Sequence, residues 1–144
     1  MVHGYDGDGG PPTAEATSGQ QSMLLAISNE IVRLYKEHFG RGPTKARTTW
    51  CGQDVLTVIL EDTLTPAERN LVKMGEHQRL RDLRLFFQYA TVREFCEPVE
   101  RLTGRKVRSF VSGMDTEENG LSVELFVLHP DGYDGPSPAE RADL

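Results

Sequence analysis

Apolar residues recur at intervals of three and four in the first part of the chain, from Leu24 to Tyr35. This spacing places them on one face of an amphipathic helix. The residues of that face are Leu24, Ile27, Ile31, Leu34, Tyr35 and His38. The pattern stops near Phe39, ahead of Gly40 and Pro43. We therefore predict a helix that ends near Phe39 and packs its apolar face on the core.

Two later regions show the alternation that is typical of strands. Residues 45–62 alternate around a Gly-Gln-Asp break and are rich in Thr, Val and Ile, which predicts a β-hairpin. Its second strand is apolar on both faces, so we expect it to be central. Residues 106–114 and 121–128 predict two more strands around the polar turn 115–120. In the last strand we expect the inward face to consist of Leu121, Val123, Leu125 and Val127.

Residues 66–103 carry a helical pattern with clear boundary signals. Thr65, Pro66 and Glu68 match an N-cap, a first-position proline and a capping box. Gly104 stands where a helix end favours a left-handed residue. We expect a break near Gly75 and a kink or division at Pro98. The positions predicted to be buried are Leu80, Leu83, Phe86 or Phe87, Ala90, Phe95, Val99 and Leu102.

The order of elements is α-β-β-α-α-β-β, in which strand pairs are separated by helices. This order predicts an α+β fold: a two-layer sandwich with an antiparallel four-stranded sheet and helices on one face. Residues 1–21 and 130–144 contain few apolar residues, so we expect a flexible leader and a flexible acidic tail. The single domain is then 22–129.

Composition narrows the class of protein. The chain has 144 residues, 38% hydrophobic and 26% charged, which fits one globular domain. No apolar run approaches the roughly 18 residues that span a bilayer, and no secretory signal begins the chain, so we expect a cytoplasmic protein that does not cross the membrane. The net charge of −6 makes nucleic acid an unlikely partner. Residues 109–144 hold most of the acidic excess, so the helical middle of the chain is mildly basic and could still bind an anionic partner.

The stretch "EHFGRGPTKAR" (37–47) has the composition of a phosphate-binding loop. Such loops enter a helix, whereas this one leaves a helix and enters a strand, at the negative end of the helix dipole. Its glycines and proline suit a capping turn instead. Its cations, with a second group before the third strand, form the candidate surface for a partner or an anion. These residues are Arg41, Lys45, Arg47, Arg105, Lys106 and Arg108.

No set of residues has the spacing of a catalytic or metal site. Cys51 and Cys96 are far apart, and we predict two reduced thiols in buried, apolar surroundings. The four histidines are scattered along the chain. We predict no cofactor, no metal and no catalytic residues, and we keep an enzyme that uses Cys51 or His77 as a minor hypothesis.

Three motifs in order carry a resemblance to a known family: "FGRGPTKAR" after the first helix, "LTPAE" after the first hairpin and "LTGRKV" after the helical region. Together they resemble the MpsC-type family over Ile27 to Leu128. The family takes its name from a Na⁺-translocating, membrane potential-generating system. The resemblance implies an accessory role on the cytoplasmic side, peripheral to the inner face of the membrane, and it carries over no site residues.

Two functional hypotheses follow. The first is a non-catalytic cytoplasmic accessory or regulatory module that binds protein subunits of that membrane system. The alternative is a regulatory domain that binds an anion, a nucleotide or nucleic acid through the six cations. A homodimer is compatible with either hypothesis, because a small sheet with one uncovered apolar face often pairs with a second copy.

Overall fold

The computed structural model describes residues 14–140, so residues 1–13 of the expected leader and 141–144 of the expected tail lie outside the described part of the chain. The elements are α1 (Ala14–Phe39), β1 (Lys45–Trp50), β2 (Val55–Glu61), α2 (Pro66–Lys73), α3 (His77–Ala90), α4 (Val92–Thr103), β3 (Val107–Asp115), β4 (Leu121–Leu128) and a 3₁₀ helix at Pro138–Glu140. The predicted order is confirmed, and the helical region between the two hairpins holds α2, α3 and α4.

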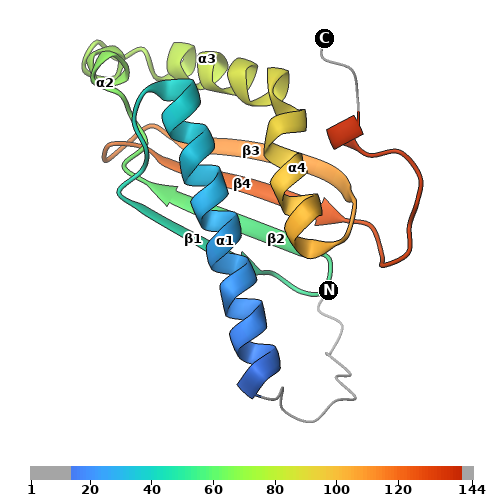
Figure 1. Ribbon diagram of the computed structural model, residues 1–144. Helices are drawn as coiled ribbons and strands as arrows, with labels where there is room; N and C mark the ends of the chain where they lie inside the picture. Colours follow the sequence, from blue (N-terminus) through green and yellow to red (C-terminus); the bar gives the residue numbers. More distant parts are fainter. Residues whose placement is uncertain (1–13, 141–144) are drawn as a thin grey trace.

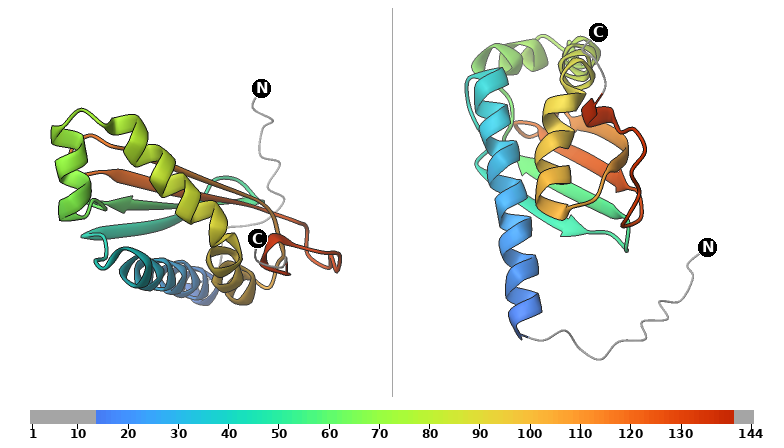
Figure 2. Two further views of the ribbon diagram at one scale, coloured as in Figure 1. Left: turned by 90° about the horizontal axis from the view of Figure 1, so that it is seen from above. Right: turned by 45° about the vertical axis from the view of Figure 1, so that its right-hand side comes forward.

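The strands form one antiparallel sheet in the order β1-β2-β4-β3. Helices α1 and α4 lie side by side across one face of this sheet (Figure 1). Seen from above, both helices lie on the same side of the strands (Figure 2, left). Among residues 14–140, no helix covers the opposite face. The predicted two-layer α+β sandwich is therefore confirmed.

The core lies between the sheet and these helices. The predicted face of α1 is confirmed, because Ile27, Ile31 and Tyr35 are fully buried. Beneath them, Leu56, Val58 and Leu60 of β2 are also fully buried. A row of rings continues the core across the sheet: Phe95 stacks on Phe110 at 5.9 Å between centroids, and Phe110 lies 5.2 Å from Phe126.

The predicted inward face of β4 is wrong. Ser122, Glu124, Phe126 and Leu128 point inward and are at most 3% exposed. Leu121, Val123, Leu125 and Val127 instead lie on the uncovered face of the sheet, where each is exposed or half-buried. The physical reason is that Glu124 finds hydrogen-bond partners under the helices, which alternation along one strand does not reveal.

The helix boundaries confirm most of the local signals. Thr65 and Glu68 form the capping box at the start of α2, and Gly104 ends α4 with a left-handed φ of 72°. Pro98 does not divide α4, which runs through it; the helical region divides at Thr91 instead. In α3, Leu80 is buried as predicted, whereas Leu83, Phe86, Phe87 and Ala90 are exposed.

Both predicted flexible segments contain ordered structure. Helix α1 begins at Ala14, inside the segment 1–21, so that 14–21 is helical. Residues 130–140 fold back over α4 and β3, where Ser137 and Pro138 are buried. Lys106 donates to Glu140 at 2.6 Å and to the carbonyl of Gly135 at 2.7 Å, which fastens this segment to β3. Within residues 14–140, no helix combines the length and apolar character that crossing a bilayer requires.

Candidate functional site

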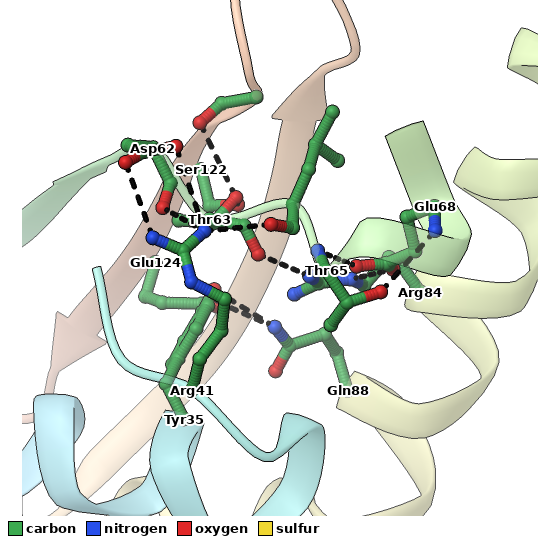
Figure 3. A network of polar contacts seen from close by, with 12 residues as sticks. Tyr35, Arg41, Asp62, Thr63, Thr65, Glu68, Arg84, Gln88, Ser122 and Glu124 are labelled. Carbon is green, nitrogen blue, oxygen red and sulfur yellow. Dashed lines mark hydrogen bonds and ion pairs between the residues drawn. The ribbon is translucent and has the colours of Figure 1, made fainter. Parts of the chain in front are cut away.

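A buried carboxyl group is part of a network of polar contacts between the sheet and the helices (Figure 3). Glu124 of β4 is 0% exposed. The Tyr35 hydroxyl of α1 donates to its Oε1 at 2.6 Å, and Gln88 Nε2 of α3 donates to the same oxygen at 2.8 Å. Gln88 Nε2 also lies 3.0 Å from the Tyr35 oxygen. This triad joins the sheet to both a covering helix and α3.

Burial raises the pKa of Glu124 to about 8, although hydrogen bonds from Tyr35 and Ser112 and the charge of Arg84 act in the opposite direction. Desolvation favours the neutral acid because the charged form loses its hydration. The pKa of Tyr35 is also well above its usual value, through burial first and then through the neighbouring carboxyl. Both groups are therefore predominantly neutral at pH 7.

A second buried pair lies beside this triad. Arg84 of α3 is 3% exposed, and its Nε and Nη2 donate to the two carboxylate oxygens of Glu68. Nη2 also donates to the carbonyl of Thr63 at 2.5 Å. The guanidinium carbon lies 3.8 Å from the ring centroid of Phe39, a cation–π contact. Burial works to raise the pKa of Glu68, but the bonds from Arg84 and from the Thr65 backbone outweigh it and lower the pKa.

The buried side chains of Arg84 and Gln88 fix the rotation of α3 about its own axis. Leu80, Arg84 and Gln88 follow one another at intervals of four and all point inward. Three other large apolar residues of the helix therefore face solvent: Leu83 is 44% exposed, Phe86 69% and Phe87 43%. We call these three residues the α3 surface. Sequence analysis missed it because hydrophobicity alone assigns these residues to the core; the only signal was the spacing of Arg84 and Gln88.

The candidate cations do not converge on one site. Arg41 is used internally: its Nη1 donates to the carbonyls of Asp62 at 3.0 Å and Leu64 at 2.6 Å, and its Nη2 donates to the Asp62 carboxylate at 3.1 Å. Gly40, with φ 80°, ends α1 just before it. The loop that resembles a phosphate site is thus a capping turn whose arginine ties α1 to the start of α2.

Arg105 and Lys106 are also engaged. Arg105 donates to the Asp54 carboxylate and to the carbonyls of Gln53 and His129, joining the β1–β2 turn to the end of β4. Lys106 holds the C-terminal segment, as described above. The remaining three cations, Lys45, Arg47 and Arg108, are exposed, and among residues 14–140 none of them has an ion pair. They lie on β1 and β3, the two opposite edges of the sheet.

The buried titratable groups lie away from solvent. Glu124 and Tyr35 are fully buried, so a substrate cannot reach them in this conformation. Cys51 is exposed, contrary to the prediction, and its sulfur lies 2.8 Å from the Thr57 hydroxyl; Cys96 is buried as predicted. His77 Nδ1 lies 2.6 Å from the Thr116 hydroxyl. Between residues 14 and 140, no group of three His, Cys, Asp or Glu side chains could hold a metal ion.

Comparison with known proteins gives one match. A family model described as "Na+-translocating membrane potential-generating system (MpsC)" matches residues 20–130. No curated protein and no solved structure gives a match.

We predict that Glu124→Gln flattens the dependence of stability on pH. The folded state keeps a proton on Glu124 up to about pH 8, whereas the unfolded chain releases it near its usual pKa of 4.5. Between these values the wild-type free energy of unfolding therefore falls as pH rises, by up to about 1.4 kcal/mol per pH unit from this group. Chemical denaturation at pH 5, 6, 7 and 8 measures the slope.

Glutamine keeps an oxygen that accepts from Tyr35 and Gln88, but it does not titrate. The variant therefore loses the contribution of residue 124 to the pH dependence of the unfolding free energy. Glu118→Gln, in the exposed turn between β3 and β4, is the matched control and should keep the wild-type slope. Equal slopes in Glu124→Gln and wild type would contradict the assignment.

We also predict that Arg41→Ala and Arg47→Ala differ sharply in stability. Removal of Arg41 leaves two carbonyls without this donor and leaves the Asp62 carboxylate with the longer ion pair to Arg69 at 3.7 Å, which should cost about 2 kcal/mol of unfolding free energy. Arg47 is exposed on β1, so its removal should change stability by less than about 0.5 kcal/mol. Urea denaturation checks both, and a similar loss in the two variants would show that the Arg41 contacts contribute little.

Proposed function

This chain belongs to the MpsC family, and we propose that it is a non-catalytic accessory or regulatory module of the Na⁺-translocating, membrane potential-generating system. In this proposal it acts on the cytoplasmic side by binding protein subunits of that system. Membership over residues 20–130 associates the chain with such a system. The accessory role, the binding of protein subunits and the location at the inner face of the membrane are our proposals.

The observation that carries this proposal is the α3 surface. Leu83, Phe86 and Phe87 lie within about one quarter of the helix circumference, because they are separated by three and four residues. The ring of Phe87 packs edge-on to Phe39 of α1 at 6.2 Å, and Phe86 packs edge-on to Phe87 at 5.9 Å. A group of exposed large apolar side chains is typical of a binding surface.

The energetics favour a protein partner for this surface. Aromatic side chains dominate the binding energy of protein interfaces when they enter a pocket from which water is excluded. Arg79 lies one turn before Leu83, and its side chain is 73% exposed with only a long contact to Glu76. A cation at the rim of an apolar surface accelerates association with an acidic partner more than it raises affinity.

The interior of the protein supports a non-catalytic role. Its buried polar groups are used to hold α1, α2, α3 and β4 together, and Glu124 and Tyr35 expose no atom to a substrate. The anion-binding alternative has a weaker basis, because Arg41, Arg105 and Lys106 are occupied by internal bonds. The α3 surface, by contrast, is apolar and exposed.

We predict that Leu83→Ala with Phe86→Ala strongly reduces capture of the membrane subunits. The tagged full-length chain would be incubated with detergent-solubilised membranes of the source organism, and captured subunits would be identified by mass spectrometry. We expect the amount captured to fall at least about tenfold, since loss of one interface anchor costs about 2 kcal/mol. Thermal unfolding should change little, because both side chains are largely exposed in the free protein.

Leu25→Ala is the matched control, since Leu25 is 62% exposed on α1, away from the α3 surface; it should capture the same subunits as wild type. Equal capture by the double variant would refute a role for the α3 surface. Binding of wild type to protein-free lipid vesicles, lost in the double variant, would show that the surface binds lipid rather than protein.

A further inference from the structure

The face of the sheet opposite α1 and α4 is apolar at its centre. The residues that point to it from β2, β3 and β4 include Val55, Ile59, Val111, Leu121, Val123, Leu125 and Val127. Val111 is 52% exposed and Leu121 38%. A Cβ atom placed on Gly113 would have no neighbour within 4 Å, which shows that nothing in residues 14–140 covers β3 at that point. We call this the open face.

The pairing register shows which charged residues of the open face lie in the same row across the sheet. One row across the sheet contains Arg47, Ile59, Val123 and Gly113, from β1 through β2 and β4 to β3. In the adjacent row Lys45 pairs with Glu61, and Asp115 pairs with Leu121 at the far edge. The open face thus has two cations on its β1 edge, with Glu61 of β2 beside Lys45, and a carboxylate on its β3 edge, all at the same end of the strands.

We propose that the open face binds the open face of a second copy of this chain, in a symmetric dimer whose two-fold axis runs parallel to the strands. This rotation places β1 of each copy over β3 of the other without exchanging the ends of the strands. Lys45 and Arg47 then lie over Asp115 and Gly113 of the second copy. The interface is self-complementary, as a two-fold dimer requires.

The same two-fold rotation also brings the apolar side chains at the centre of the two open faces together. Ile59 lies over Val123 of the second copy, and Val55 lies over its Val127, so the aliphatic side chains of the two central strands pack on one another. Sheets packed face to face in this way keep their strands within about 30° of each other. A two-fold axis at right angles to the strands would instead place β1 over β1 of the second copy with the strand ends reversed, so that Lys45 would not face Asp115.

Gly113 has no side chain, so it leaves room for Arg47 of the second copy to reach Asp115.

The strands are about 4.8 Å apart and β2 is about 23 Å long, so the open face measures roughly 19 by 23 Å as a flat surface, without the added area of its side chains. The two copies together would bury roughly 900 Å², which is in the range of weak, transient interfaces. We therefore expect a dimer with a dissociation constant in the micromolar range.

The test is sedimentation equilibrium of the full chain from about 1 to 200 µM, comparing wild type with Gly113→Arg. The arginine would enter the interface and face the cation Arg47 of the second copy. Gly113 is exposed and its φ is not in the positive range, so the monomer should fold unchanged, as circular dichroism would check. We expect wild type to dimerise and Gly113→Arg to weaken the dimer by at least about 100-fold.

Two matched variants make the result specific. Asp115→Asn keeps the oxygen that accepts from the Glu117 backbone at 2.9 Å but loses the charge, so it should weaken the dimer about fivefold at low salt and less at high salt. Leu83→Ala with Phe86→Ala should dimerise as wild type does, because α3 does not line the open face. This separates dimerisation from capture of membrane subunits, and either can fail without the other.

A wild-type protein that stays at its monomer mass of 16.1 kDa up to 200 µM would overturn the proposal. A folded Gly113→Arg variant that dimerises as strongly as wild type would also overturn it, since the dimer would then use another surface.

Discussion

The structure depends on a carboxyl group that lies in its core. Glu124 is fully buried on the inner face of β4, and an ionised carboxylate there would lose its hydration without an opposite charge in direct contact. The protein keeps the group neutral and supplies Tyr35 from α1 and Gln88 from α3 as hydrogen-bond donors. These bonds specify which helix faces meet the sheet, because only one rotation of each helix brings its donor to the acid.

Helix α3 shows the effect of this constraint most clearly. Its inward side carries Arg84 and Gln88 beside the buried Leu80, so bonds to Glu68 and Glu124 help to set how the helix docks. Three of its large apolar side chains, Leu83, Phe86 and Phe87, are left on the outside. Two surfaces thus remain apolar in the folded chain: the α3 surface and the open face of the sheet.

Local signals in the sequence were sufficient for much of the fold, whereas contacts between distant residues were not. The capping box at Thr65 and the glycine at the end of α4 act within a few residues and were predicted correctly. The inward face of β4 depends on Tyr35, 89 positions away, so hydrophobicity selected the wrong side of the strand. Likewise, the charge pattern could not distinguish Arg41, whose partner Asp62 is 21 positions away, from the exposed Arg47.

The way in which α3 is held has a consequence for how this family can diverge. In most surface helices the apolar stripe serves folding, so selection for stability keeps it unchanged. Here Arg84 and Gln88 secure the helix, and the residues on its outer side are released from that duty. Homologues can therefore exchange Leu83, Phe86 and Phe87 for side chains that suit a different partner while they retain the same fold, so that binding specificity and stability evolve on separate sets of positions.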